Sequence, residues 1–401
     1  MSNWKTYKLS DFVEINPRVS LKQGNEYSFV EMKDLDATFK YVTPSAKKEL
    51  KGGAKFENGD TLFARITPCL ENGKICQVKE LENNVGFGST EFLIFRGKEN
   101  VSNADFVYYL MRSDYVRNNA IQMMSGTSGR QRVEKSALEE LEIQAPDLVT
   151  QVEIAQILSS LDDKIELLQQ MNQTLENIAQ AIFKEWFVDF NFRGFDGELV
   201  DGLPKGWNYK AIKDLGKVVT GNTPASKNPE YFGKVTPFVT PTDFKNFGKL
   251  IISANRFLSN EGKLAMKSRL LPIHSIVVTC IGSDMGKVAM NSVECITNQQ
   301  INSIIPNQEN IRDYLYYDLV YKYEYLRNIA TGGSTMPIIN KSRFEEIEVV
   351  VPTSDILDNF QLLMNSFNSK IEENIKQLDS LTQTRDTLLP KLMSGQLGIK
   401  N

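Results

Sequence analysis

Histidine is scarce in this 401-residue sequence, and so are clustered metal ligands. His274 is its one histidine, and the four cysteines Cys69, Cys76, Cys280 and Cys295 lack the spacing of zinc ligands. A hydrolase would need a histidine beside a nucleophile, and a metal-dependent nuclease would need clustered carboxylates. The sequence therefore predicts no metal centre and no disulfide framework, and the cysteines are expected to be small buried residues.

Long apolar runs are also missing. Nothing approaches the eighteen consecutive apolar residues of a membrane span, and the opening MSNWKTYKLS is polar. We therefore expect a cytoplasmic protein with no membrane association. Hydrophobic residues make up 41% and charged residues 24%, which is ordinary globular composition, and the length predicts two or three domains.

A large positive charge, which many DNA-binding proteins carry, is absent, because the formal net charge is −4. The acidity is concentrated in residues 151–195, which hold three basic and seven acidic residues. Residues 1–150 have 20 basic against 21 acidic residues, and residues 196–350 have 18 against 16. DNA binding would thus depend on local patches, or on cationic partners, rather than on a global field.

The sequence does contain an internal repeat. Residues 125–146 align without a gap to residues 331–352 at a constant offset of 206, and the same offset extends into the segments that follow. Earlier in each half the offset drifts to 203 at Trp4 and Trp207, and to 213 at Gly73-Lys74-Ile75 and Gly286-Lys287-Val288. Loops of different length explain the drift, and a period this long indicates two copies of one domain.

Each half predicts a mixed unit, then a closing strand, then a long helix. Strands are expected at residues 91–95, 276–279 and 347–351, which are rich in β-branched or aromatic residues. Single helices are expected at 104–124 and 311–330, each ending before a cluster of glycine, serine and threonine. The Gly-Lys-Ile and Gly-Lys-Val segments lack the other residues of a phosphate loop and are expected to be hairpin turns.

Two long helices are expected at about 151–188 and 357–394, each with the 4-3 apolar spacing of a coiled coil. The alternative is that each helix lies on its own domain. Because the linker from 187 to 203 is short, mutual pairing would be antiparallel, which places Asn172 opposite Asn374. The residues expected to pair are Leu161, Ile165, Leu168, Asn172, Leu175, Phe367, Ile371, Asn374, Leu378 and Leu381.

Several segments carry a resemblance to a known family. They are residues 158–166 (LSSLDDKIE), 181–187 (AIFKEWF), 388–395 (LLPKLMSG), 220–224 (TGNTP) and 298–302 (NQQIN). Together with the repeat, they make nearly the whole chain resemble the specificity subunit of type I restriction-modification systems. The second long helix departs from the pattern, since Asn365-Ser366 stands there in place of the usual leucine and aspartate.

The resemblance implies an α+β fold with two similar mixed α/β target-recognition domains, separated by a long antiparallel two-helix coiled coil and related by an internal pseudo-twofold repeat. Its implied domains are the recognition domains 1–148 and 191–354, the first spacer helix 149–190, and the second spacer helix with the C-terminal tail, 355–401. A helix of 38 residues would be about 57 Å long, enough to separate two groove readers by more than one DNA turn of about 34 Å.

The resemblance also implies function and partners. Each domain would read one half of a bipartite, asymmetric target in double-stranded DNA, while the helices bind two methyltransferase subunits. Restriction or translocase subunits would join through the complex. The chain itself would be non-catalytic and bind no cofactor, with S-adenosylmethionine, ATP and magnesium held by partner subunits.

Two other functions remain open from the residues alone. Asn228-Pro229-Glu230-Tyr231 is one residue from the Asn-Pro-Pro-Tyr motif of adenine-specific DNA methyltransferases, although no glycine-rich loop follows a strand to hold S-adenosylmethionine. The segment also fits a turn. A coiled-coil scaffold protein would account for the long helices but not for the two repeated globular units.

The candidate DNA contacts lie in loops with small residues and basic or amide side chains. Small residues let the backbone approach phosphates, while Arg, Asn and Gln side chains reach base edges. The same loops also fit simple helix ends and turns. The candidates are Ser125, Thr127, Ser128, Arg130, Gln131, Arg132, Arg65, Lys74, Lys47 and Lys48 in the first half, and Thr220, Asn222, Thr223, Lys227, Ser334, Thr335 and Asn340 in the second.

Overall fold

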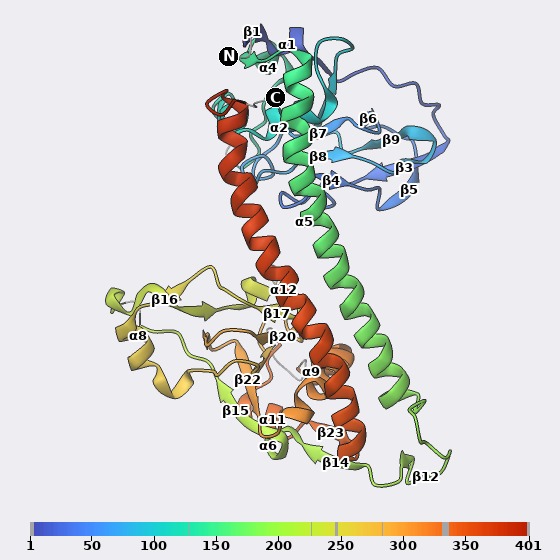
Figure 1. Ribbon diagram of the computed structural model, residues 1–401, viewed down its shortest axis with the longest axis vertical. Coiled ribbons are helices and arrows are strands. Elements are labelled where there is room, and N and C mark those ends of the chain that lie inside the picture. The colour runs from blue at the N-terminus through green and yellow to red at the C-terminus, as the bar shows by residue number, and fades with distance from the viewer. Residues whose placement is uncertain are drawn as a thin grey trace. The chain divides into compact units, whose positions relative to one another are not determined.

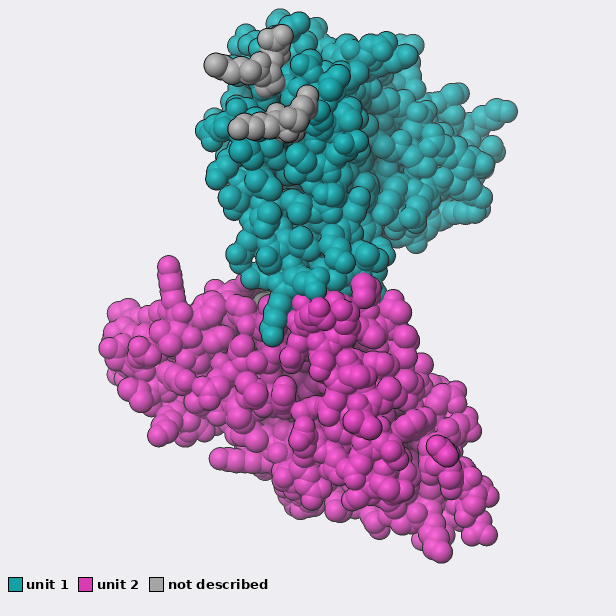
Figure 2. Space-filling view, viewed as in Figure 1, with its two compact units in different colours: residues 1–170, 375–401 teal, residues 171–374 magenta. Residues whose placement is uncertain are grey.

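The chain forms two compact units in the computed structural model, which describes residues 4–127, 129–225, 227–244, 248–282, 284–330 and 337–398. Unit 1 consists of Met1–Gln170 and Ile375–Asn401, and unit 2 of Met171–Asn374 (Figure 2). Each unit therefore combines one sheet-containing domain with one end of each long helix. Within the described ranges, no helix is long and apolar enough to cross a membrane.

Unit 1 is built on two sheets. The five-stranded sheet has the order β2-β10-β7-β8-β4, and the four-stranded sheet the order β5-β3-β9-β6. A separate antiparallel pair, β1 with β11, joins the start of the domain to its end. The strands are β1 (Lys5–Lys8), β2 (Val13–Ile15), β3 (Glu26–Val30), β4 (Tyr41–Val42), β5 (Ala46–Glu49), β6 (Ala54–Glu57), β7 (Thr61–Ala64), β8 (Ile75–Val78), β9 (Val85–Gly88), β10 (Phe92–Gly97) and β11 (Glu142–Ala145).

Unit 2 repeats this arrangement. Its five-stranded sheet has the order β15-β22-β19-β20-β17, a three-stranded sheet has the order β18-β16-β21, and β14 pairs with β23. The strands are β14 (Asn208–Ala211), β15 (Gly216–Thr220), β16 (Phe232–Val239), β17 (Leu250–Ile251), β18 (Phe257–Leu258), β19 (Ile276–Thr279), β20 (Val288–Asn291), β21 (Ile296–Thr297), β22 (Ile301–Pro306) and β23 (Glu348–Val351). The hairpin β12 (Leu199–Val200) and β13 (Leu203–Pro204) precedes them.

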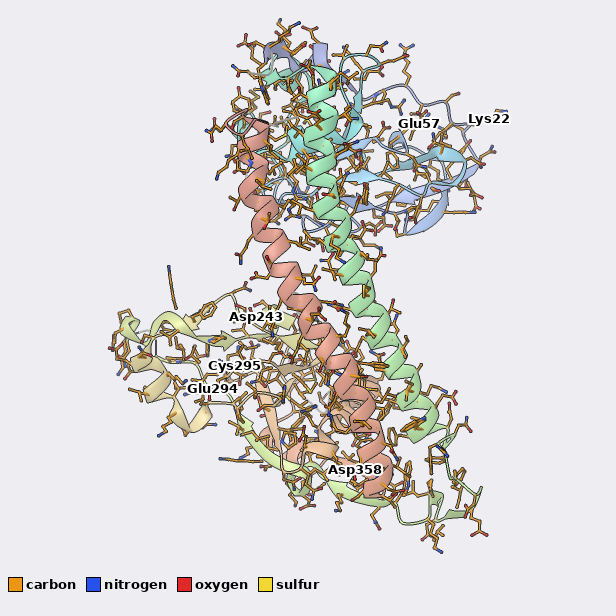
Figure 3. The ribbon with its side chains drawn as sticks, in the orientation of Figure 1. Lys22, Glu57, Asp243, Glu294, Cys295 and Asp358 are labelled. Carbon is orange, nitrogen blue, oxygen red and sulfur yellow. The ribbon has the colours of Figure 1, made fainter. Side chains whose placement is uncertain are left out.

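The two sheet domains share their strand directions as well as their strand order. β4 pairs with β8 in parallel, as β17 does with β20, and β3 pairs with β9 in parallel, as β16 does with β21. The turn after β3 is closed by Asp34, which accepts from the Glu31 N–H at 2.7 Å. After β16, Asp243, labelled in Figure 3, accepts from the Thr240 N–H at 2.8 Å. The repeated domain and the mixed α/β fold are confirmed.

The turns at Gly73 and Gly286 are the expected hairpin turns. Each glycine has a positive φ, 70° and 85°, which glycine adopts without steric cost. The lysine after each glycine accepts an equivalent backbone hydrogen bond, from Ala64 N to Lys74 O at 3.1 Å and from Thr279 N to Lys287 O at 3.0 Å. The first turn connects β7 to β8 and the second connects β19 to β20, so neither is a phosphate loop.

The two medium-length helices differ from the prediction, because each is broken into two. Residues 104–124 form α2 (Ala104–Arg112) and α3 (Asp114–Gln122), and residues 311–330 form α9 (Arg312–Tyr321) and α10 (Tyr323–Ala330). Ser113 interrupts the first with φ −57° and ψ 146° and caps α3 through its hydroxyl. A serine that accepts a backbone N–H favours a helix start over a helix interior, and the apolar periodicity does not report such a break.

The long helices are α5 (Leu148–Phe183), which continues through a π-helical turn at Lys184–Val188, and α12 (Ser354–Met393) (Figure 1). In unit 1, Asp162 and Arg385 pair at 2.8 Å. In unit 2, Asn374 donates to Asn172 at 2.7 Å, while the rings of Phe183 and Phe360 lie 6.3 Å apart. Residue numbers rise along one helix as they fall along the other, so within each unit the helices are antiparallel.

The 4-3 stripe of these helices faces inward. Ile165, Leu168, Ile371 and Asn374 are buried, and Asn374 has no exposed surface. The other residues expected to pair are half-buried: Leu161, Asn172, Leu175, Phe367, Leu378 and Leu381. The hydrogen bond between the two asparagines is the contact that the antiparallel register predicts.

The main core of unit 1 joins its domain to both helices. Ile154, Ala155 and Leu158 of α5 are buried in one cluster with Leu392 and Met393 of α12. That cluster also holds Phe106, Val107, Tyr108, Tyr109, Leu110 and Met111 from α2. The helices therefore share the hydrophobic core of the domain, and burial of this apolar surface stabilises the unit.

A buried lysine on two tyrosines is repeated in the two units. The Lys40 Nζ lies 5.4 Å from the ring centre of Tyr109 and 2.7 Å from Asp105. It also donates to Ser159 of α5 at 2.7 Å, so it fastens the domain to the helix. The sequence did not predict this cluster, although the paired tyrosines recur in the repeat.

In unit 2, Lys249 takes the same place. Its Nζ lies 4.4 Å from the ring centre of Tyr317 and 2.9 Å from Asp313. Asn368 and Gln361 of α12 donate to the Asp313 carboxylate at 2.8 and 2.6 Å. Each sheet domain is thus attached to a long helix through a hydrogen-bonded network around a buried lysine as well as through apolar packing.

Candidate nucleic-acid interface

Four loops of unit 1 meet at one edge of its five-stranded sheet. We call them the unit 1 edge loops: residues 16–20 after β2, 65–67 after β7, 89–91 before β10 and 125–132 after α3. Backbone hydrogen bonds join three of them, from Arg65 N to Glu91 O at 2.9 Å, from Val133 N to Arg65 O at 3.0 Å and from Thr67 N to Gln131 O at 3.0 Å.

The corresponding loops of unit 2 meet in the same way, and we call them the unit 2 edge loops: residues 220–223, 280–282, 298–300 and 337–340. Cys280 N donates to Gln300 O at 2.7 Å, Ile339 N to Cys280 O at 2.9 Å and Gly282 N to Pro337 O at 3.2 Å. These bonds match those of unit 1 one for one. The backbone frame is therefore repeated, while the side chains that it presents differ.

The loop at 125–132 is a closed hairpin with an exposed tip. Ser125 and Arg132 exchange two backbone hydrogen bonds of 2.9 Å, and Gly129 turns the chain at φ 78°. Thr127 and Arg130 are exposed, and the Arg130 guanidinium makes no hydrogen bond or ion pair with the described residues. Ser128 lies outside the described residues. Of the two arginines in this loop, Arg130 presents its charge to solvent.

Two arginines at the edge are held by carboxylates of their own unit. Arg132 binds Glu91 in a two-point contact, with its Nε 2.9 Å from one oxygen and its Nη2 2.7 Å from the other. This hydrogen bonding, assisted by the arginine charge, holds the pKa of Glu91 below its usual range. The Arg65 Nη2 lies 2.7 Å from Glu134. The sequence alone does not distinguish these paired arginines from Arg130.

In unit 2, two motifs that are distant in sequence pack together at the edge. The Thr220 hydroxyl donates to Asn302 at 2.6 Å, and the Thr223 hydroxyl donates to Gln299 at 2.6 Å. Between them Gly221 approaches the other strand so closely that a Cβ would lie 2.1 Å from the Asn298 carbonyl oxygen. Asn222 is exposed next to these groups, so these two motifs present hydroxyl and amide side chains. The Arg269 guanidinium donates to the Thr220 carbonyl oxygen beside them.

The remaining candidate DNA contacts differ in exposure and in the groups that they bind. Lys227 is exposed, Gln131 is half-buried, and Ser334 and Thr335 lie outside the described residues. Lys74 donates to the Met32 carbonyl at 2.8 Å. Asn340 caps α11 (Lys341–Glu345) by accepting from Arg343 N at 2.9 Å.

Two candidate lysines of unit 1 lie on β5 rather than in the edge loops. Lys47 forms an ion pair with Glu82 at 2.7 Å, and Lys48 pairs with Glu31. Both lysines are exposed. They contribute charge to the surface, but an opposite charge of the same unit accompanies each.

The structure also shows basic residues that were not among the candidates predicted from the sequence. Arg18 and Lys55 line a groove of about 720 Å³ together with Arg65, above Phe92 and Ile94 of β10. No motif marks Arg18 or Lys55, because they come from different loops and meet only in the folded unit.

The motif Asn228-Pro229-Glu230-Tyr231 forms a turn of 3-10 helix at Pro229–Tyr231. Among the described residues, no group of three or more histidine, cysteine or carboxylate side chains could hold a metal ion.

The cysteines differ in burial. Cys76, Cys280 and Cys295 are buried, and desolvation raises the pKa of each thiol to about 12. A raised thiol pKa lowers the thiolate fraction and makes these side chains unreactive. Cys69 is half-buried.

Comparison with known proteins identifies the family. The model for the type I restriction modification DNA specificity domain matches residues 1–177 and 204–388, one match for each half of the chain. The chain therefore belongs to the family of type I restriction-modification DNA specificity domains.

Named relatives extend over the whole length. The chain is 32% identical to the type I restriction enzyme HindI specificity subunit of Haemophilus influenzae, covering 99% of this chain and 100% of the relative. It is 28% identical to the MjaIX specificity subunit of Methanocaldococcus jannaschii, covering 99% and 94%. The fold resembles the crystal structure of a type I S subunit from M. genitalium, with a TM-score of 0.58, 17% identity and coverage of 98% and 96%. The relatives support the specificity function and not a methyltransferase.

Proposed function

We propose that this chain is the DNA-reading subunit of a type I restriction-modification complex and that each set of edge loops contacts one half of a bipartite, asymmetric target in double-stranded DNA. The observation that supports this is the repeated backbone frame with different side chains. Exposed Arg130 stands at one edge, and Asn222 and Gln299 stand at the other. Bases are distinguished by side chains at their edges, so two frames of this kind would recognise two different half-sites.

The proposed division of labour follows the sequence repeat. Residues 1–148 and 191–354 act as recognition domains, and residues 149–190 and 355–401 act as spacer helices. α5 carries five exposed hydrophobic residues, and beyond Leu148 and Val149 at its start they are Ile157, Leu167 and Ile178, which recur about every three helical turns. An apolar stripe on a surface helix supports binding of a partner protein, and we propose two methyltransferase subunits as the partners.

The proposed subunit performs no chemistry itself. The methyltransferase partners would bind S-adenosylmethionine, and the restriction or translocase subunits, which join through the complex, would bind ATP and magnesium. Because its substrate is the DNA of the cell, we propose that the complex works in the cytoplasm.

Sequencing of DNA methylation tests the proposal directly. The gene is expressed with its methyltransferase partner in a host that lacks other DNA methylation, and the same host without this gene serves as the control. We expect a new methylated motif of two different specific parts separated by a non-specific spacer. A continuous or palindromic motif, or methylation that persists without this chain, would contradict the proposal.

Arg130→Ala tests the edge loops within the same complex. We expect it to weaken binding to the methylated sequence by about 1–3 kcal/mol if a base contact is lost. Lys8→Ala is the matched control, because it removes the same charge from the same unit. Lys8 is exposed and is paired with Glu140 at 2.7 Å. Equal affinities for the two variants would assign the 125–132 loop a structural role.

A further inference from the structure

The groove beside the unit 1 edge loops has the chemistry of an anion site. Arg18, Lys55 and Arg65 line it, and no carboxylate is among its described lining residues. Neither the Arg18 guanidinium nor the Lys55 ammonium forms an ion pair or hydrogen bond with the described part of the chain. Its floor is apolar, formed in part by Phe92 and Ile94. A groove with cationic walls and an apolar floor matches a phosphate joined to a sugar.

Arg18 is placed there by its neighbour Asn16. Asn16 has φ 56°, in the left-handed region that asparagine tolerates better than most residues. Its backbone N–H donates to the Ile94 carbonyl at 2.8 Å, and its side-chain oxygen accepts from the Ile94 N–H at 2.9 Å. These two bonds hold the turn against β10 and direct residues 17–20 along the groove.

Lys55 reaches the groove from another segment, at the start of β6. The preceding Gly53 has φ 117°, and a Cβ there would lie 2.1 Å from the Gly88 carbonyl oxygen, so only glycine fits. This close approach packs the start of β6 on β9 and fixes where Lys55 emerges. Arg65 is the third basic residue that lines the groove. Its Nη2 is paired with Glu134, but its Nε is buried and has no hydrogen-bond partner in the described residues.

Unit 2 differs at the equivalent place. The backbone bond from Arg65 N to Glu91 O corresponds to the bond from Cys280 N to Gln300 O, so a buried cysteine stands where unit 1 has an arginine. The glycine of the 220–223 loop lies directly against the 298–300 turn, since a Cβ on Gly221 would lie 2.1 Å from the Asn298 carbonyl oxygen. Arg65 is therefore a feature that distinguishes the two halves.

We propose that this groove binds a phosphate of the DNA backbone, clasped between Arg18 and Lys55, and that this contact anchors the duplex to unit 1 by charge. This inference rests on the proposed function. A phosphate contact positions the protein without carrying sequence information, so it sets affinity and its salt dependence rather than the sequence that is recognised.

The test uses the assembled complex with its methyltransferase subunits and a duplex of the sequence that the methylation experiment identifies. The variant is Arg18→Gln/Lys55→Gln, and affinity is measured by fluorescence anisotropy over a range of salt concentrations. Loss of one phosphate contact should reduce the slope of log affinity against log salt by about 0.9 and weaken binding at low salt. The methylated sequence should stay unchanged.

Two further variants make the test specific. Lys8→Gln/Lys33→Gln removes the same charge from unit 1 at two exposed lysines that are already paired, with Glu140 and Glu31, and should leave the slope unchanged. Arg18→Lys/Lys55→Arg keeps the charge and should restore the wild-type slope. Single phosphates along the duplex are also replaced, one at a time, by a neutral methylphosphonate. Replacement at one position should weaken binding by the wild-type complex and should have no effect on binding by the glutamine variant.

The outcomes separate this inference from the function itself. If the wild-type complex shows no preference for the identified sequence, the proposed function fails. If the complex does show that preference, two results would refute the phosphate assignment while leaving the proposed function intact. One is that the groove variant keeps the wild-type salt slope, and the other is that the control variant loses as much slope as the groove variant. A changed first half of the methylated sequence would overturn it too, because the groove would then read bases.

Discussion

Replacing the buried lysine by methionine should lower the free energy of unfolding by very different amounts in the two units, although the clusters around Lys249 and Lys40 are equivalent. Lys249→Met leaves Asp313 in a site where the carboxylate has no exposed surface. Lys40→Met leaves Asp105, which is 41% exposed and can be hydrated. Methionine keeps the length of the aliphatic stem in both variants, so the difference isolates the lost charge.

The magnitude follows from what remains around Asp313. Removing one partner of a buried ion pair costs about 3–5 kcal/mol. Arg312 still lies 3.0 Å from the Asp313 carboxylate, and Gln361 and Asn368 still donate to it, so we expect the lower end, about 3 kcal/mol. For Lys40→Met we expect about 1 kcal/mol, as for pairs with an exposed partner.

Hydrogen exchange by mass spectrometry measures each unit separately. Peptides from α9 should exchange roughly 150-fold faster in Lys249→Met, and peptides from α2 roughly 5-fold faster in Lys40→Met, at about tenfold per 1.4 kcal/mol. Each variant should leave the other unit's peptides unchanged. An equal loss of protection, or a larger one for Lys40→Met, would refute the argument that carboxylate burial sets the cost.

Three other predictions concern acid stability, the asparagine pair and cysteine reactivity. Burial alone would raise the pKa of Asp313, but Lys249 and Arg312 outweigh it and hold the pKa well below its usual range. A depressed pKa stabilises the fold above the unfolded value near 4, so acid titration followed by circular dichroism should show this stability being lost below about pH 4, and less of it in Lys249→Met. Asn374→Leu should lower the midpoint of thermal unfolding, because it leaves Asn172 unpaired. Adding Asn172→Leu should restore or raise the midpoint, because the Asn374 side-chain oxygen already lacks a partner in the described residues of the wild-type protein. A midpoint lower in the double variant than in the single variant would contradict this. Iodoacetamide should label Cys69 in the folded protein and spare the three buried cysteines, and equal labelling of all four would show that their burial does not limit reactivity.

Features that repeat along the chain were predictable from the sequence. The turns at Gly73 and Gly286 were found because each half carries the same local pattern. The pairing of Asn172 with Asn374 followed from helical periodicity and from the short linker, which together require an antiparallel register. The break at Ser113 was missed, because the apolar pattern continues across it and the serine acts only through its local backbone bonds.

The candidate DNA contacts could be located only to their loops. Arg130 and Arg132 are two residues apart in one polar segment, yet Arg132 is taken by Glu91, which is 41 residues away in the chain. Arg18 and Lys55 show the converse, since neither belongs to a motif and they come together across one groove.

The sequence by itself therefore determined the repeated domain, the helical pairing and the family, because these depend on periodicity, offset and local turn chemistry that can be read along one dimension. Only the tertiary structure decided which cations are paired and which are available, since a charge is neutralised by whatever the fold places within a few ångströms of it. Lys40 shows this difference, because it is an ordinary surface residue type in the sequence and is buried against two tyrosines in the folded unit.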